Sequence, residues 1–174
     1  MAPGFDNIQC IASYSRVTED HALRLDIGDL YAAYAACLDE GRFDDWPGFF
    51  VEDCRYRVIP RENHEQGLPL CTMDLQSRGA LKDRVYGVQS TLFHAPYYQR
   101  HIIGPIRITG RSGNVSMVEA NYLVVRTKRD APSELFNAGR YIDRVVATAN
   151  GLQFIEKICV FDSELIPNSM IYPI

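Results

Sequence analysis

The residues with the greatest capacity for chemistry are the four histidines and five cysteines, with the tyrosines, carboxylates and arginines near them. A histidine beside a carboxylate or tyrosine in a dry pocket can acquire a shifted pKa and transfer protons. The residues that fit such a pocket are His94, Tyr98, His101, Tyr141, Asp143 and Arg144. Because these residue types form structural ion pairs more often than catalytic centres, the sequence leaves both interpretations open.

The spacing of the cysteines and histidines does not match a metal centre. No cysteine has a histidine within three residues, which excludes the paired Cys-x-His and Cys-x-x-His elements of a Rieske cluster. The chain also lacks HExxH, GxGxxG, GxxxxGK[ST] and GxSxG motifs. The odd number of scattered cysteines indicates reduced, buried thiols. The sequence therefore predicts no cofactor in this chain.

Charge and hydropathy exclude two kinds of partner. The net charge of −4 argues against nucleic acid, because neutralising phosphates requires clustered Lys and Arg. No apolar run reaches membrane-spanning length, and the first ten residues lack the pattern of a signal peptide. We therefore expect a cytoplasmic protein whose partners are small molecules or other proteins.

Apolar residues at helical spacing predict three helices. The first ends at Gly41, which suits the left-handed position after a helix. A short second helix at 42–50 is expected to have Asp44 as its cap. The third begins at its own cap, Ser77, and ends before Pro96.

Alternating apolar and polar residues predict five strands. Three of them lie at 54–60, 100–109 and 115–128. The other two form a long antiparallel hairpin at 134–165, which has the clearest period-two pattern in the chain. Asn150-Gly151 is expected to take positive φ at both central positions of its turn.

This order of elements predicts a single α+β domain over residues 18–174, preceded by an arm at 1–17. We expect a strongly bent antiparallel sheet in a cone-like arrangement, covered by the N-terminal helices, with the first and third helices on its concave face. Residues 61–76 are expected to cross the surface as a loop. Gly104-Pro105 and Gly139 are candidates for the bulges or kinks that bend the sheet.

Two segments have the composition of contact surfaces. Residues 95–105 combine two tyrosines with arginine and histidine, in the manner of interface hot spots. Residues 165–174 are apolar and are expected to dock against other elements. Ordinary burial in the core is the competing interpretation for both segments.

Six segments carry a resemblance to a known family. They are RFDDWPGFFVEDCRYRV (42–58), NHEQGL (63–68), DRVY (83–86), YQRHIIG (98–104), FNAGRYIDR (136–144) and CVFDSELI (159–166). In this order and spacing the chain resembles the small (beta) subunits of bacterial aromatic-ring-hydroxylating dioxygenases. It is most similar to the terephthalate dioxygenase and salicylate hydroxylase branch, which acts on aryl carboxylates.

The resemblance implies a cystatin-like, nuclear transport factor 2-like fold. It also implies an alpha3beta3 hexamer whose alpha subunits carry the Rieske [2Fe-2S] cluster and mononuclear iron, with a self-associating beta trimer and a reductase or ferredoxin that serves the complex indirectly. No catalytic, metal or cofactor residue is carried over to this chain. The candidates for subunit contacts or structural ion pairs are Tyr98, Arg100, His101, Arg140, Tyr141, Asp143 and Arg144.

Two other classes of function are compatible with the same fold. A free-standing isomerase or dehydratase would use histidine, aspartate and tyrosine in a dry cavity and would need no partner. A pure ligand-binding module is the third possibility. A neighbouring gene that encodes the Rieske motifs would favour the oxygenase subunit, and its absence would favour the free-standing enzyme.

Overall fold

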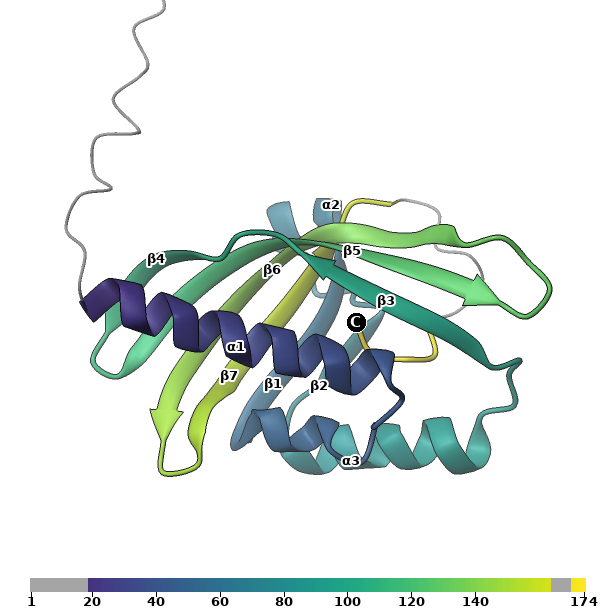
Figure 1. The fold of residues 1–174 in the computed structure, drawn as a ribbon, viewed down its shortest axis with the longest axis horizontal. Helices are drawn as coiled ribbons and strands as arrows, with labels where there is room; N and C mark the ends of the chain where they lie inside the picture. The colour runs from purple at the N-terminus through teal and green to yellow at the C-terminus, as the bar shows by residue number, and fades with distance from the viewer. Residues whose placement is uncertain (1–18, 164–169) are drawn as a thin grey trace, which may run out of the picture.

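A computed structural model describes residues 19–163 and 170–174, in which a long helix lies across one face of a bent sheet (Figure 1). In chain order the elements are α1 (Glu19–Asp39), the 3-10 turn η1 (Trp46–Phe49), β1 (Phe50–Pro60), α2 (Arg61–Glu65), β2 (Met73–Leu75), α3 (Arg78–Tyr86), the π-helical turn η2 (Gly87–Thr91), β3 (Tyr97–Ile103), β4 (Arg107–Ser112), β5 (Val115–Lys128), β6 (Glu134–Thr148) and β7 (Gly151–Phe161). None of the described helices combines the length and apolar character needed to cross a membrane.

The sheet has the strand order β2-β1-β7-β6-β5-β3, with β4 also paired to β5. The predicted α+β cone is therefore confirmed. One pairing differs from the expected antiparallel sheet, because β1 and β7 are parallel. Hairpins dictate the direction of β5, β6 and β7, whereas β1 is far from β7 in the sequence and no turn sets their relative direction.

The core lies between α1 and the sheet. α1 contributes Tyr31 and Tyr34, which are buried against Phe154 of β7. Trp46 is also buried, with its ring edge-on to Tyr56 of β1. Burying one such aromatic side chain stabilises a fold by about 2 kcal/mol. Packing of α1 on the sheet therefore contributes much of the stability.

Local signals located some boundaries correctly and missed others. Ser77 caps α3 as predicted, with its Oγ accepting the Ala80 N–H at 3.1 Å. The expected cap at Asp44 is wrong, because η1 begins after Asp45 and has no side-chain cap. The predicted loop at 61–76 contains α2 and β2.

The predicted single strand at 100–109 is two strands, β3 and β4, which are separated at Gly104-Pro105. Proline has no N–H to donate to a ladder, so pairing is interrupted there. A kink at these two residues was expected from the sequence. The break lets β3 and β4 pair with different stretches of β5.

The turn of the β6–β7 hairpin lies one residue earlier than predicted. Thr148 pairs with Gly151, which leaves Ala149 and Asn150 between the strands. Gly151 has a φ of 97°, whereas the only described non-glycine residue with positive φ is Asp130. The hairpin therefore requires left-handed backbone at the glycine and not at Asn150, as in a turn followed by a glycine bulge.

Gly139 lies at a close approach between β6 and β7 rather than at a bulge. It pairs in register with Phe161, and the register shifts of β6 lie at other positions. A Cβ atom on Gly139 would lie 2.0 Å from the carbonyl oxygen of Val160. The obstacle is backbone, which cannot rotate away as a side chain can.

Replacing Gly139 with alanine is therefore expected to lower the free energy of unfolding by about 3 kcal/mol. Urea denaturation followed by circular dichroism measures this change. Gly48→Ala is a matched control, because a Cβ at Gly48 would meet nothing within 4 Å. Equal stability of the two variants would show that β6 and β7 separate easily at this point.

Residues 170–174 dock into the core, which confirms the expectation for this part of the apolar segment 165–174, whereas residues 164–169 lie outside the described chain. The carbonyl oxygen of Ile174 accepts hydrogen bonds from Tyr34 Oη at 2.8 Å and Tyr56 Oη at 3.0 Å. Arg84 Nη2 donates to the carbonyls of Met170 and Ile171 at 2.8 and 2.7 Å. The segment is therefore bound by side chains from α1, β1 and α3.

Candidate functional site

A buried ion pair lies at the centre of the domain. Asp143 of β6 and Lys157 of β7 face each other across the hairpin, and both side chains are 0% exposed. Lys157 Nζ is 2.9 Å from Asp143 Oδ2, which also accepts a hydrogen bond from Tyr31 Oη. The Ile158 N–H donates to Asp143 Oδ1 at 3.2 Å. Because a buried carboxylate without partners is costly, these three donors stabilise the Asp143 side chain in the core.

Aromatic rings surround the Lys157 ammonium group. Its nitrogen lies 3.4 Å from the centroid of the Tyr141 ring and 4.6 Å from those of Tyr31 and Tyr34. The Phe154 centroid is 4.7 Å away. The negative faces of aromatic rings attract a cation, and the attraction is larger when water is excluded. Lys157 is thus held by one carboxylate and by four rings.

The electrostatics of this centre disfavour nucleophilic or acid–base chemistry at neutral pH. Burial raises the pKa of the Cys159 thiol to about 12, so the nucleophilic thiolate is scarce. Burial also raises the pKa values of Tyr31 and Tyr141 well above 10. The pKa of Asp143 is raised by burial and lowered in part by Lys157, with a net increase. These groups are bonded to one another and packed among rings, so the arrangement stabilises charge within the fold.

The six residues expected to share an acid–base pocket do not come together. Tyr141 and Asp143 lie in the buried centre. His94 is in the segment after η2, and its Nε2 is 2.9 Å from Tyr172 Oη. Tyr98 is 76% exposed on β3, and Arg144 is exposed on β6. The residues are distributed over three regions of the molecule.

His101 forms a second buried pair, with Asp39 at the end of α1. Its Nδ1 is 2.6 Å from Asp39 Oδ1, and its backbone N–H donates to Asp39 Oδ2 at 2.9 Å. The His101 side chain is 0% exposed. Asp39 therefore covers an N–H of the edge strand β3 and orients the imidazole at the same time.

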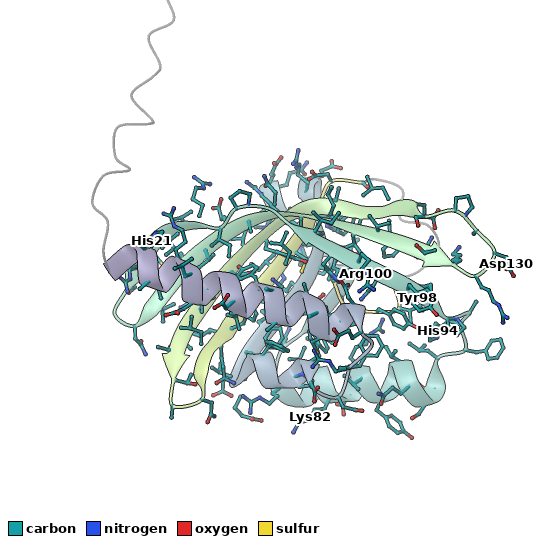
Figure 2. The ribbon with its side chains drawn as sticks, viewed as in Figure 1. His21, Lys82, His94, Tyr98, Arg100 and Asp130 are labelled. Carbon is teal, nitrogen blue, oxygen red and sulfur yellow. The ribbon has the colours of Figure 1, made fainter. Side chains whose placement is uncertain are left out.

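The seven candidates divide between the two roles expected of them, because Asp143 and His101 form pairs within the chain. The side chains of His101, Tyr141 and Asp143 are buried within the chain, so they are unavailable for contacts with a partner. Arg100 and Arg144 are exposed, as Tyr98 is, and Arg140 is partly buried. Figure 2 shows Tyr98 and Arg100 on β3. Only these four of the seven remain candidates for a subunit contact.

The face of the sheet opposite α1 carries an exposed apolar patch, which we call the outer patch. Its members are Tyr98, Ile102, Leu123 and Leu135, which are 76, 56, 41 and 61% exposed. Ile102 pairs directly with Leu123 across β3 and β5, and both residues line a hollow of about 550 Å³. Contiguous apolar surface of this kind marks an interaction site more often than isolated apolar residues do.

The described residues contain no group of three or more His, Cys, Asp or Glu side chains placed to hold a metal ion.

The residues that sequence reasoning missed are Lys157, Tyr31 and Asp39. The register skips Ile155, which turns Lys157 inward together with Phe154 and interrupts the alternation along this strand. No local signal marks such a bulge.

Comparison with known proteins gives consistent results. Residues 19–157 match the model of the SnoaL-like domain. The chain is 31% identical over 158 residues to the anthranilate 1,2-dioxygenase small subunit of Burkholderia cepacia, an alignment that covers 91% of this chain and 98% of the relative. It is 29% identical to the beta 1 subunit of the terminal oxygenase component of terephthalate 1,2-dioxygenase from Comamonas sp, over 86% of this chain and 97% of the relative.

A crystal structure from Novosphingobium aromaticivorans, of a beta subunit assigned to an aromatic-ring-hydroxylating dioxygenase, superimposes with a TM-score of 0.82 at 36% identity. The superposition covers 89% of this chain and 99% of that one. The likeness therefore extends over nearly the whole length of both chains.

Proposed function

The chain belongs to the SnoaL-like family and, within it, to the beta subunits of aromatic-ring-hydroxylating dioxygenases, and from this premise we propose that it is the non-catalytic subunit of an oxygenase that hydroxylates an aromatic carboxylate. The near full-length match to a dioxygenase small subunit carries the proposal. Anthranilate and terephthalate, the compounds in the names of its relatives, are both aromatic carboxylates, which supports that substrate class.

The partner in this proposal is the alpha subunit, in a cytoplasmic alpha3beta3 hexamer with a beta trimer. The Rieske cluster and mononuclear iron of that subunit would supply the oxygen chemistry. This chain supplies rigidity, because its charged centre is bonded internally and its core is closed by residues 170–174. A rigid support lets three alpha subunits keep a fixed relative position.

The outer patch is the proposed contact with the alpha subunit. It combines apolar area with Arg100, which lies between Tyr98 and Ile102 on β3, and with Arg140, which pairs with Asn121 two residues from Leu123, whereas Arg144 lies further along β6. Arginine and aromatic residues are enriched at interfaces, whereas lysine and glutamate are depleted. The patch also lies opposite α1, so contact there leaves the helical side accessible.

Replacing Ile102 with glutamate is expected to weaken co-purification with a co-expressed alpha subunit about tenfold or more, since it places a charge at the centre of the proposed contact. Ile102 is 56% exposed, so the fold should survive the change. Leu25→Glu is a matched control on α1, where Leu25 is 58% exposed. Equal co-purification of both variants would remove the outer patch from the proposal.

The non-catalytic role is tested by measuring iron and visible absorbance in two samples. The chain purified alone is expected to contain no stoichiometric iron, and its complex with the alpha subunit is expected to show the bands of a Rieske cluster and to oxidise aromatic carboxylates. Stoichiometric iron in the isolated chain, or ring hydroxylation by the alpha subunit unaffected by its absence, would contradict the proposal.

A further inference from the structure

We propose that Arg57, His64 and Arg140 form a binding site for a carboxylate group that comes from outside this chain. The carboxylate belongs either to a small aromatic acid or to an acidic side chain of a partner protein, and the two sources give different experimental results. The inference is independent of the proposed function, because it rests on unused positive charge and on geometry within this chain.

Arg57 and Arg140 lie on the face of the sheet opposite α1, on either side of β7. The residue before Arg57 and the residue after Arg140 are buried tyrosines of the core, so alternation along each strand turns the two arginines to the other face. Arg57 pairs with Ile158 of β7, and Arg140 pairs with Val160. One strand therefore separates the two arginines, about 10 Å across, and their long side chains can reach the same ligand.

His64 of α2 lies close to both arginines. α2 packs on β1 and β7, and Figure 1 shows it behind the sheet, on the side away from α1. Burial lowers the pKa of His64, the positive charges of Arg140 and Arg57 lower it further, and Glu65 opposes them. Charges act in this way only at short range. The imidazole and the two guanidinium groups are therefore gathered at one place on the outer face.

The backbone that carries His64 is fixed by its neighbour in the chain. Asn63 Nδ2 donates to the Leu70 carbonyl at 2.8 Å, and the Leu68 N–H donates to the Asn63 carbonyl at 2.8 Å. These two bonds close the segment that follows α2. A group that is fixed before binding loses little entropy when a ligand arrives.

The chain leaves much of the hydrogen-bonding capacity of the two arginines unused. Within residues 19–163 and 170–174, neither Arg57 nor Arg140 forms an ion pair with a carboxylate. Arg57 Nη2 donates to Cys71 Sγ at 3.1 Å, and the Nε atoms of both arginines are buried without a hydrogen-bond partner in this part of the chain. Buried donors without acceptors are rare and costly. The two side chains are therefore poorly explained by the fold alone.

The neighbouring carboxylates bind other arginines. Asp74 pairs with Arg57 across β1 and β2, yet its two carboxylate oxygens accept from Arg55 at 3.0 and 2.8 Å. Asp162 is likewise bound to Arg61, at 2.7 Å. The chain as a whole has a net charge of −4, so two arginines without a carboxylate partner are a local excess of positive charge. An anion from outside the chain would neutralise it.

The chemistry of the site favours a carboxylate attached to an apolar group. A guanidinium presents two parallel N–H groups, which match the two oxygens of a carboxylate. Ile158 and Ile142 continue the row of paired residues from Arg57 across β7 and β6, and both are partly exposed. Apolar side chains next to cations suit a benzoate-like ring better than a free inorganic anion, so a small aromatic acid is the expected source.

Nuclear magnetic resonance of the isolated full chain, titrated with sodium benzoate, tests the site. His64→Gln identifies the signal of His64 among the four histidines. Benzoate is expected to raise the pKa of His64, because a bound carboxylate offsets the arginine charges that lower it. By linkage, benzoate binding should become tighter as the pH falls from about 8 to about 6, since a protonated His64 adds a third positive charge.

Three variants separate a ligand site from a structural role. Arg57→Gln and Arg140→Gln are each expected to weaken benzoate binding about tenfold. Arg144→Gln is the matched control, because Arg144 is an exposed arginine on the same strand as Arg140, and it should bind as the wild type does. The first two variants should melt at the wild-type temperature or above it, because each removes an uncompensated charge. A lower melting temperature with unchanged benzoate affinity would overturn the inference.

Co-purification with a co-expressed alpha subunit distinguishes the two sources of the carboxylate. A partner's acidic side chain is the source if Arg57→Gln and Arg140→Gln lower co-purification about tenfold while benzoate leaves His64 unchanged. Variants that alter neither benzoate binding nor co-purification would overturn the inference. A wild-type chain that binds benzoate but no alpha subunit would instead contradict the proposed function and leave the site intact.

Discussion

Replacing Lys157 with methionine is expected to lower the free energy of unfolding by about 4 kcal/mol at neutral pH, since it leaves the Asp143 carboxylate buried without its cation. Methionine keeps most of the side-chain volume, so the loss reports charge rather than packing. Chemical denaturation of the isolated chain measures the change. The double variant Lys157→Met/Asp143→Leu is expected to recover most of the lost stability, because well-packed apolar pairs often replace buried ion pairs without cost.

The loss of unfolding free energy in the Lys157→Met variant is expected to depend on pH in a defined direction. Burial already raises the pKa of Asp143 in the folded chain, and loss of Lys157 removes the positive charge that most strongly lowers it. A carboxyl group whose folded pKa is raised contributes stability that is present below the unfolded pKa of about 4 and is lost as pH rises through the folded pKa. The gap between the Lys157→Met variant and wild type should therefore be smaller at pH 5 than at pH 8. A gap independent of pH would show that Asp143 does not titrate in the variant.

Deleting residues 170–174 is expected to prevent stable folding. The deletion exposes the cavity occupied by the buried side chains of Met170 and Ile174, each worth about 2 kcal/mol of apolar burial. It also leaves Tyr34, Tyr56 and Arg84 without their backbone acceptors. The combined loss of unfolding free energy exceeds about 5 kcal/mol, which is comparable to the whole stability of an ordinary domain.

Circular dichroism and thermal melting of the truncated chain measure this loss. Tyr34→Phe provides a graded comparison, because it removes one hydrogen bond to Ile174 and should cost about 1 kcal/mol. Addition of the peptide Met-Ile-Tyr-Pro-Ile is expected to restore part of the near-ultraviolet signal. A truncated chain with the melting temperature of the full chain would show that residues 170–174 cover the core without stabilising it.

The sequence was sufficient where local chemistry decides the outcome. Ser77 caps its helix as predicted, and Gly41 takes a φ of 70° at the end of α1. The long hairpin and its neighbour β5 were also predicted, because a period of two persists through many residues. Period-two alternation along β6 is also seen in the structure, which buries Tyr141, Asp143 and Val145 on one face.

The remaining features depend on contacts between distant residues. Tyr31 and Asp143 are separated by 112 positions, so nothing near either residue indicates their hydrogen bond. The bulge at Ile155 reverses the side of the sheet to which Lys157 points, and alternation alone cannot detect it. His101 had the composition of an exposed contact, but Asp39 at the far end of α1 draws it inward.

The parallel pairing of β1 with β7 has a consequence for how the chain is made. The register joins Tyr56 to Lys157 and Val58 to Cys159, so the centre of the sheet closes only when residues about a hundred positions apart have met. A ribosome releases β1 long before β7 exists, and during that interval Phe50 and Tyr56 of β1 lack the strand that pairs with them on the β7 side. Such non-local closure slows folding and exposes the nascent chain to aggregation. Production of this subunit should therefore depend on chaperone capacity more strongly than its final rigidity suggests.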